Sequence, residues 1–218
     1  MRQHYGMTKL TGQQIAEQKL DGWAHLYDSL KTRIATPDFA SGLALVDTIG
    51  AVATELDHHP DVDLRYTFVE IRLTSHDVGG VTRRDIRLAR RIDGLAAAAG
   101  LSTDRSRVSH LEIGLDSPEP GAVGDFWAAV LDTDNHGEEV IDPAGALPTV
   151  WFQRSGREEP RQRWHFDLWV EPEQVQQRID RAIAAGGSLV SDADAPSFWV
   201  LADAEGNRMC LCTWKDRD

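Results

Sequence analysis

The sequence lacks the marks of a membrane, secreted or disulfide-rich protein. No apolar run approaches the ~18 residues that a membrane helix needs, and Met1 to Gly6 lack the apolar block of a secretory signal. Only two cysteines occur, Cys210 and Cys212, and we expect both to be reduced thiols in or near a core. The default expectation is therefore a cytoplasmic protein.

An excess of positive charge is also missing. The formal net charge is -12, and the two halves differ: residues 1–103 carry 12 Lys+Arg against 13 Asp+Glu, which leaves -11 for residues 104–218. An acidic surface repels phosphate backbones and anionic lipids. We therefore expect neither nucleic acid nor a membrane as a partner.

What is present is enough apolar material for two cores. The chain has 218 residues, of which 41% are hydrophobic and 27% charged, as is usual for globular proteins. A short polar stretch from Leu101 to Arg107 has the composition of a linker. We therefore predict an α+β protein of two domains, at residues 1–101 and 108–218.

Local patterns in the first half predict three helices and at least three strands. Thr11 and Gln14 fit a capping box for a first helix that ends near Leu20. Thr36-Pro37 is a helix start, and apolar residues recur at helical spacing from there to Leu56. Thr82, with Asp85 three positions later, begins a third helix that Gly100 ends. Strands are predicted at residues 23–26, 30–34 and 67–73.

Three histidines lie at the junctions of these elements. His58 and His59 follow the long helix, Pro60 takes His59 out of helical geometry, and His76 follows the strand that ends at Leu73. Histidine exchanges protons near neutral pH, which suits general acid–base catalysis. The alternative is that the first two cap helix carbonyls. The third histidine favours a catalytic site, and Asp85, structural first, could also orient one of the rings.

A longer set of residues around these histidines resembles the pterin-4a-carbinolamine dehydratase family, between about Leu10 and Gly100. The matching residues are Gly22-Trp23, Glu55 to Pro60, Tyr66, Leu73-Thr74-Ser75-His76-Asp77, Gly79, Thr82-Arg83-Arg84-Asp85-Ile86 and Leu88-Ala89. The resemblance implies a four-stranded antiparallel sheet with helices on one face, and a homodimer or homotetramer.

By this resemblance the catalytic residues are His58, His59 and His76, with a pterin as the small-molecule substrate and no cofactor. It implies substrate-binding or orienting roles for Glu55, Pro60, Thr74, Ser75, Asp77 and Asp85. Direct proton transfer is assigned to His59 or His76, with His58 anchoring the ring. Two positions depart from the family: Val62 stands where an aromatic residue is usual, and Thr67 where asparagine is usual. Valine offers a flat ring less stacking surface.

The second half contains a repeat. Ser109-His110-Leu111-Glu112 and Trp164-His165-Phe166-Asp167 each begin a predicted strand that leads to a helix and further strands. The spacing of 55 residues between the two histidines suits a βαβββ unit used twice. With Asp203 to Asn207 before the last strand, this pattern resembles the glyoxalase or vicinal-oxygen-chelate family, whose paired units often hold a divalent metal.

The metal of that family is not expected here, because its usual carboxylate is replaced by Cys210. His110, His165 and Cys210 stay as candidate zinc ligands, and otherwise as hydrogen-bonded or core residues. Two alternatives to the dehydratase are a dimerisation module that carries a small-ligand sensor, and a metal-dependent lyase or dioxygenase in the second domain.

Overall fold

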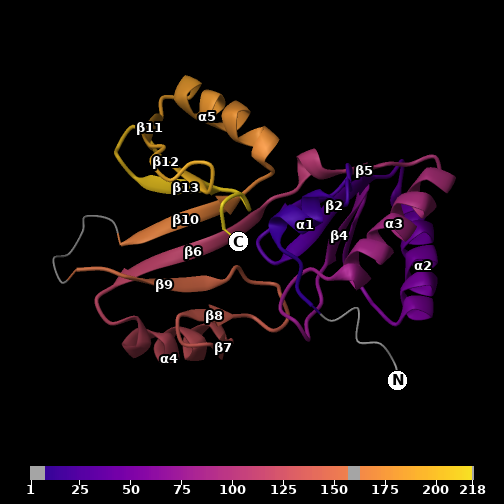
Figure 1. Ribbon diagram of the computed structural model, residues 1–218, viewed down its shortest axis with the longest axis horizontal. Coiled ribbons are helices and arrows are strands. Elements are labelled where there is room, and N and C mark those ends of the chain that lie inside the picture. The colour runs from indigo at the N-terminus through magenta and orange to yellow at the C-terminus, as the bar shows by residue number, and fades with distance from the viewer. Residues whose placement is uncertain (1–7, 157–162, 218) are drawn as a thin grey trace. The chain divides into compact units, whose positions relative to one another are not determined.

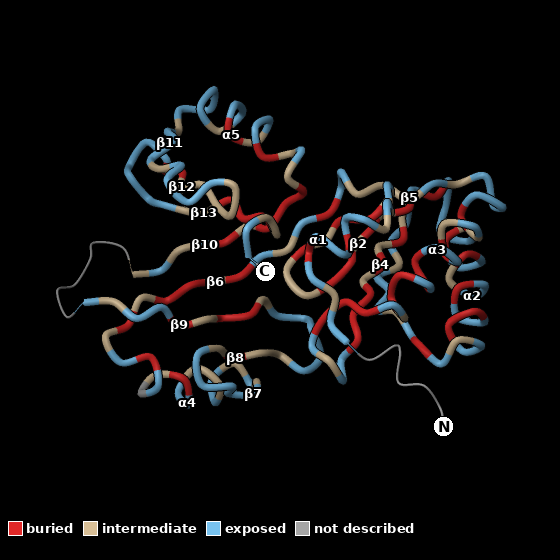
Figure 2. The backbone as a smooth tube through the Cα atoms, in the orientation of Figure 1, coloured by how far each residue is buried: buried red, intermediate tan, exposed pale blue. Residues whose placement is uncertain are grey.

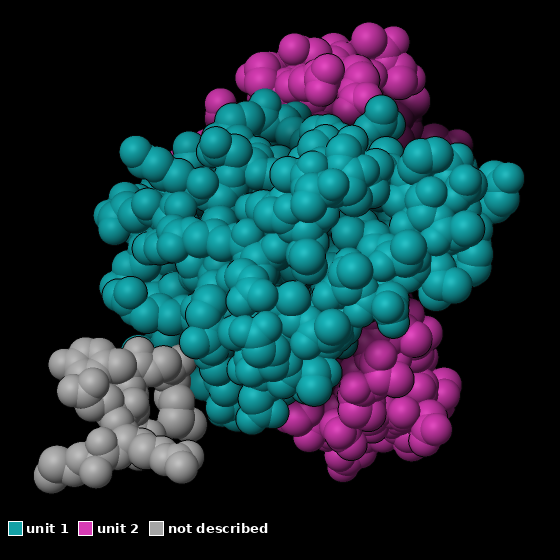
Figure 3. Space-filling model, turned by 90° about the vertical axis from the view of Figure 1, so that its right-hand side faces the viewer, with its two compact units in different colours: residues 1–109, 170–174, 213–218 teal, residues 110–169, 175–212 magenta. Residues whose placement is uncertain are grey.

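The computed structural model describes residues 8–156 and 163–217, which form two compact units (Figures 1 and 3). The first unit comprises residues up to Ser109 together with Val170–Gln174 and the residues from Thr213 on; the second comprises His110–Trp169 and Val175–Cys212. The chain therefore passes from the first unit to the second and back again. Two short segments late in the sequence, Val170–Gln174 and the residues from Thr213 on, therefore complete the first unit.

The first unit is built on an antiparallel sheet. The order is β1-β2-β4-β3, from strands β1 (Ala24–Leu26), β2 (Ser29–Ala35), β4 (Phe68–Leu73) and β3 (Asp61–Arg65). This confirms the four strands of the predicted fold. A fifth strand, β5 (Thr103–Asp104), pairs with β2, and a 3-10 turn, η1 (Arg105–Arg107), follows it. The expected linker at 101–107 is thus part of the first sheet.

Three helices accompany this sheet: α1 (Gly12–Ala16), α2 (Phe39–Leu56) and α3 (Arg83–Ala98). Both expected capping boxes are present, Thr11 with Gln14 and Thr82 with Asp85. The first helix is shorter than predicted, because the chain turns after Ala16 and Lys19 has a positive φ of 52°. The long helix starts later than predicted, with Asp38 as its N-cap and not Thr36, because the Thr36 N–H continues the sheet by bonding the Thr67 carbonyl.

The core lies between the sheet and the helices α2 and α3 (Figures 1 and 2). Strand residues of one sheet face meet the buried sides of the two helices: Leu30, Ile34, Val69, Ile71 and Leu73 with Leu45, Ile49, Ile86, Ala89 and Ile92. The opposite sheet face carries charged residues, among them the pair Arg33–Glu70. Alternation of apolar and polar side chains in β4 therefore sets which face the helices cover.

We expected no segment apolar enough to cross a membrane, but helix α2 is long and apolar enough by composition. Its 18 residues have a mean hydropathy of 1.4, so in length and composition it could cross a membrane. Core helices of soluble proteins pass the same test, and here Leu45, Ile49 and Ala53 are buried against the sheet and α3. The other side is exposed, with Phe39 46% and Leu43 52% accessible. Helix α2 is thus apolar both on the side that packs in the core and on its exposed side.

The second unit is one sheet of two βαβββ halves, as predicted. The first half runs β6 (His110–Ser117), α4 (Pro120–Leu131), β7 (Asp134–Asn135), β8 (Glu139–Ile141) and β9 (Val150–Arg154). The second runs β10 (Trp164–Trp169), α5 (Val175–Ala184), β11 (Ser188–Ser191), β12 (Phe198–Ala202) and β13 (Arg208–Cys212). The sheet order is β11-β12-β13-β10-β6-β9-β8-β7, so the first strands of the two halves pair at the centre.

The segment after β10 belongs to the first unit and carries a buried carboxylate. Glu171 is 5% exposed and accepts hydrogen bonds from the His25 N–H at 2.8 Å and from Arg105 at 3.2 Å. Burial raises the pKa of Glu171 to about 7, against the opposing effects of the His25 N–H and Arg105. The segment after β13 also returns, and the Trp214 ring lies against Gly12, where a Cβ would come within 2.7 Å of it.

Candidate active site

The end of α2 turns His58 into the protein. Asp57 adopts the left-handed conformation with φ 49°, and the His58 N–H bonds back to the Ala53 carbonyl while the Asp57 N–H bonds to Thr54. This is the Schellman arrangement that ends many helices, with aspartate in the place usually taken by glycine. Backbone bonds therefore fix the position of His58, and its side chain is 8% exposed.

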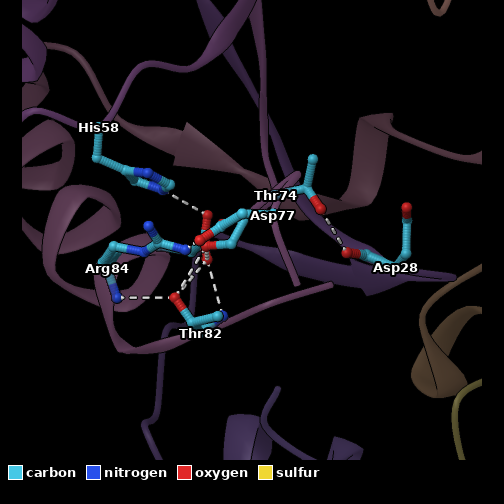
Figure 4. Close-up of polar contacts among 8 residues, drawn as sticks. Asp28, His58, Thr74, Asp77, Thr82 and Arg84 are labelled. Carbon is cyan, nitrogen blue, oxygen red and sulfur yellow. Dashed lines mark hydrogen bonds and ion pairs between the residues drawn. The ribbon is translucent and has the colours of Figure 1, made fainter. Parts of the chain in front are cut away.

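A buried carboxylate receives the His58 ring. His58 Nε2 lies 2.7 Å from Asp85 Oδ1, and the other carboxylate oxygen accepts hydrogen bonds from the Ser75 hydroxyl at 2.7 Å and from the Thr82 N–H at 2.7 Å (Figure 4). Asp85 is fully buried. Burial alone would raise its pKa, but the bonds from His58, Ser75 and Thr82 outweigh it and lower the pKa of Asp85. Asp85 is thus an ionised acceptor.

This protonation state fixes the tautomer of the histidine. An ionised carboxylate only accepts hydrogen bonds, so the proton of the shared bond is assigned to Nε2 of His58. Nδ1 is then the nitrogen of the neutral ring that can take up a proton. A carboxylate behind an imidazole orients the ring and stabilises the imidazolium once it forms. An imidazole oriented by a carboxylate in this way is chemically able to act as a general base.

Strand pairing brings the other two histidines to the same end of the sheet. Asp61 of β3 pairs with Arg72 of β4, so the chain segments just outside this pair, at 58–60 and 73–76, lie side by side. The Ser75–Asp85–His58 contacts confirm this closeness. His59 and His76 are both exposed, unlike His58. One buried, anchored imidazole and two accessible ones thus lie at this end of the sheet.

The remaining predicted site residues divide into two groups. Ser75 joins the network of Asp85, and Thr74 is buried beside it with its hydroxyl on the Asp28 carbonyl at 3.0 Å (Figure 4). Asp77 is exposed and pairs with Arg84, which lowers the pKa of Asp77. Glu55 is exposed and pairs with Arg91 of α3 at 3.4 Å, and Pro60 is half-buried.

Sequence reasoning missed two polar partners at this edge. Arg84 holds the turn after β4 through Asp77 (Figure 4), and Asp28 supports Thr74 through its carbonyl and Arg72 through its carboxylate at 3.3 Å. Arg84 stood within the residues that matched the family, but nothing indicated its partner seven positions earlier. Asp28 lies 46 positions from Thr74, and no local pattern signals such a contact.

In the second unit the candidate metal ligands are not brought together. The strand register pairs His110 with Trp169, His165 with Gly114, and Cys210 with Asp167. Within residues 8–156 and 163–217 no group of three His, Cys, Asp or Glu side chains is placed to hold a metal ion. His165 packs edge-on against the Trp151 ring at 5.3 Å, over a bare Gly114 backbone. We therefore derive no metal chemistry from this unit.

Comparison with known proteins agrees with this division. Residues 8–95 match the family described as pterin 4 alpha carbinolamine dehydratase, and residues 112–212 match a glyoxalase-like domain. A protein of Nocardia farcinica is 40% identical over 89 residues, which are 40% of this chain and 94% of that one. A protein of Thermomicrobium roseum is 38% identical over 93 residues, 42% of this chain and 100% of that one. Both are named "Putative pterin-4-alpha-carbinolamine dehydratase".

Among solved structures, a transcriptional coactivator/pterin dehydratase from Brucella melitensis is 29% identical, with a TM-score of 0.39, and covers 40% of this chain and 98% of its own. The two sequence relatives are matched over nearly their whole length, and the family match at residues 8–95 spans His58, His59, His76 and Asp85. Through its first domain the chain belongs to the pterin-4a-carbinolamine dehydratase family, and it carries a glyoxalase-like domain behind it.

Proposed function

We propose that the first domain dehydrates a 4a-hydroxytetrahydropterin to the quinonoid dihydropterin. The observation that carries this proposal is the anchored pair of His58 and Asp85, with His59 and His76 accessible at the same edge. The reaction removes a hydroxyl from C4a and a proton from N5, and it needs one proton acceptor and one proton donor. It involves no net redox change, so histidines can supply both groups.

The contact with Asp85 supports His58 as the base. Nδ1 of His58 would take the N5 proton, the electron pair of the N–H bond would form the C4a=N5 double bond, and Asp85 would stabilise the imidazolium. The C4a–O bond breaks as His59 or His76, in its protonated form, gives a proton to the departing hydroxyl. The products are water and the quinonoid dihydropterin. The acid has given its proton to the hydroxyl and the base has taken the N5 proton, and proton exchange with solvent restores both histidines. This assignment replaces the anchoring role first expected for His58.

The test compares histidine variants of the full chain in a carbinolamine dehydration assay. His58→Ala is expected to lower the enzymatic rate by roughly 10²- to 10⁴-fold, the usual contribution of a general acid or base. His59→Ala and His76→Ala identify the acid by the larger loss. His136→Ala is the matched control, because His136 is an exposed histidine of the second unit, and it should leave the rate unchanged.

Three results would contradict the proposal. Wild-type protein that does not exceed the uncatalysed rate of dehydration would exclude the enzyme. An unchanged catalysed rate in the His58→Ala variant would exclude the assigned base, and unchanged rates in both the His59→Ala and the His76→Ala variants would exclude the assigned acids. Because His58 is buried, circular dichroism of each variant must first show that the fold is intact. His58→Gln provides a less disruptive second variant with the same expected loss.

Self-association through α2 is the second part of the proposal. The exposed side of this helix carries Phe39 and Leu43, on a helix whose opposite side is already in the core. Burying an exposed phenylalanine or leucine side chain stabilises a contact by roughly 1.5–3 kcal/mol. A second copy of the same helix offers a matching apolar surface, as a two-fold interface requires. We therefore propose a homodimer or a homotetramer.

A further inference from the structure

Helix α3 carries a group of arginines that the proposed dehydration does not use. Arg83, Arg87, Arg90 and Arg91, with Gln18 and Ile86, line an open hollow of about 300 Å³ in the first unit. Guanidinium groups stay charged at all physiological pH values. The four residues recur at helical spacing, which places them on one side of α3. This side differs from the one through which Asp85 contacts His58.

Little negative charge compensates these arginines. Within the described residues, Glu55 is the one carboxylate within ion-pair distance of the four, at 3.4 Å from Arg91. The acids of α3 itself are engaged elsewhere: Asp85 with His58, and Asp93 with the Trp23 indole at 2.9 Å and the Thr103 hydroxyl at 3.0 Å. The hollow therefore keeps a positive charge of about three in a chain whose net charge is -12.

The arrangement opposes the stability of the helix. Like charges three and four positions apart repel one another, and Arg83 stands in the first helical turn, where the helix dipole disfavours a cation. Arg90 is nevertheless held in place, with Nη2 at 3.2 Å from both the carbonyl and the side-chain oxygen of Gln18. A guanidinium group that is held in place is ready to bind a phosphate through charge-assisted hydrogen bonds.

We propose that this hollow binds a small phosphate-rich anion, with the charge of a triphosphate group. Three to four negative charges match the uncompensated arginines, and planar guanidinium groups bind phosphate oxygens in pairs. A volume of about 300 Å³ is at the lower end of small-molecule sites. Ile86, 4% exposed, adds an apolar wall. A long nucleic acid is disfavoured, because the strongly acidic remainder of the chain repels it.

The first experiment is isothermal titration of the full chain with inorganic tripolyphosphate at low salt. Tripolyphosphate should bind at one site, and affinity should fall as salt rises because the charges are at the surface. Adenosine triphosphate forms the second arm. Tighter binding of the nucleotide assigns the phosphate to a nucleoside ligand, while equal binding assigns it to the phosphate chain alone, and both support the site.

Variants locate the binding. Arg87→Gln with Arg90→Gln should weaken tripolyphosphate binding about 100-fold, since each lost charge-assisted contact typically corresponds to about ten-fold. Arg87→Lys with Arg90→Lys keeps the charge but loses the paired geometry and should be intermediate. The matched control, Arg65→Gln with Arg107→Gln, removes two exposed arginines of the same unit from outside the hollow and should bind as the wild type does.

Three outcomes would overturn the proposal. One is the absence of tripolyphosphate binding at low salt. Another is equal weakening in the hollow variant and the matched control, which would mean that net charge alone is responsible. The third is tighter binding of a single-stranded RNA oligonucleotide than of tripolyphosphate through the same arginines, which would assign the surface to a polymer. The histidine variants test the dehydratase separately, so failure of either proposal leaves the other intact.

Discussion

Replacing Glu171 by glutamine should change how the stability of the protein depends on pH. Its carboxyl group is buried, and its pKa is raised from the ordinary 4.5 to about 7 in the folded chain, mainly because burial disfavours the charge. Between these two pH values the unfolded chain has lost this proton and the folded chain retains it. The group's contribution to stability is therefore present in full below pH 4.5 and is lost as the pH rises through 7.

The size of the effect follows from the difference between the two pKa values. Each unit of pKa corresponds to about 1.4 kcal/mol, so the free energy of unfolding should fall by about 2–3 kcal/mol between pH 5 and pH 8 through this group alone. Glutamine has the shape of the protonated acid and keeps an oxygen for the His25 N–H. Glu171→Gln should therefore remove this part of the pH dependence, and the variant should be more stable than wild type at pH 8.

Urea unfolding at pH 5 and pH 8, followed by the fluorescence of the seven tryptophans, measures the effect. Other groups titrate over the same range, so the informative quantity is the difference in pH dependence between the variant and the wild type. Glu17→Gln is the control, because Glu17 is an exposed carboxylate of the same unit. An unchanged pH dependence in Glu171→Gln, or an equal change in Glu17→Gln, would refute the reasoning.

Three further predictions concern the network, the second sheet and the exposed helix. Asp85→Asn turns an acceptor-only group into one with an N–H₂ facing buried donors, and should lower the free energy of unfolding by roughly 1–3 kcal/mol in urea titrations; stability equal to wild type would contradict the network. Gly114→Ala places a Cβ within 2.4 Å of the His165 ring, and this overpacking should lower the free energy of unfolding by roughly 1–3 kcal/mol. Thermal unfolding measures the effect. The control is Gly121→Ala, where the added Cβ meets open space. Leu43→Glu should shift the mass measured by light scattering towards the monomer, and an unchanged mass would exclude α2 as the interface.

The parts of the fold that sequence reasoning predicted are those governed by local rules. Thr82 and Asp85 form their capping box because the spacing of three positions alone brings the two groups together. The alternation in β4 predicted its buried face for the same kind of reason. Strand β3 could not be read from its own residues, because its side chains are mostly exposed at the edge of the sheet. The two-residue strand β5 is too short to carry a pattern.

The sequence indicated which residues to consider for the candidate site, but not how they are buried or which groups they contact. The histidines stand out in the sequence, and a second role for Asp85 was anticipated. The burial of His58 depends on the left-handed turn at Asp57, a conformation that aspartate takes up less often than glycine. The return of Glu171 to the first unit, 146 positions away from its partner His25, has no local signal. Such contacts are decided by packing.

This return has a consequence for how the chain acquires its structure during synthesis. A domain at the start of a chain usually folds while the ribosome is still making the next one. Here the dehydratase-like unit receives Glu171 and Trp214 only after most or all of the glyoxalase-like half has been translated. Until those residues are made, Arg105 lacks its contact with Glu171 and Gly12 lacks its contact with Trp214. The first unit therefore completes its structure only after the chain of the second unit has been synthesised.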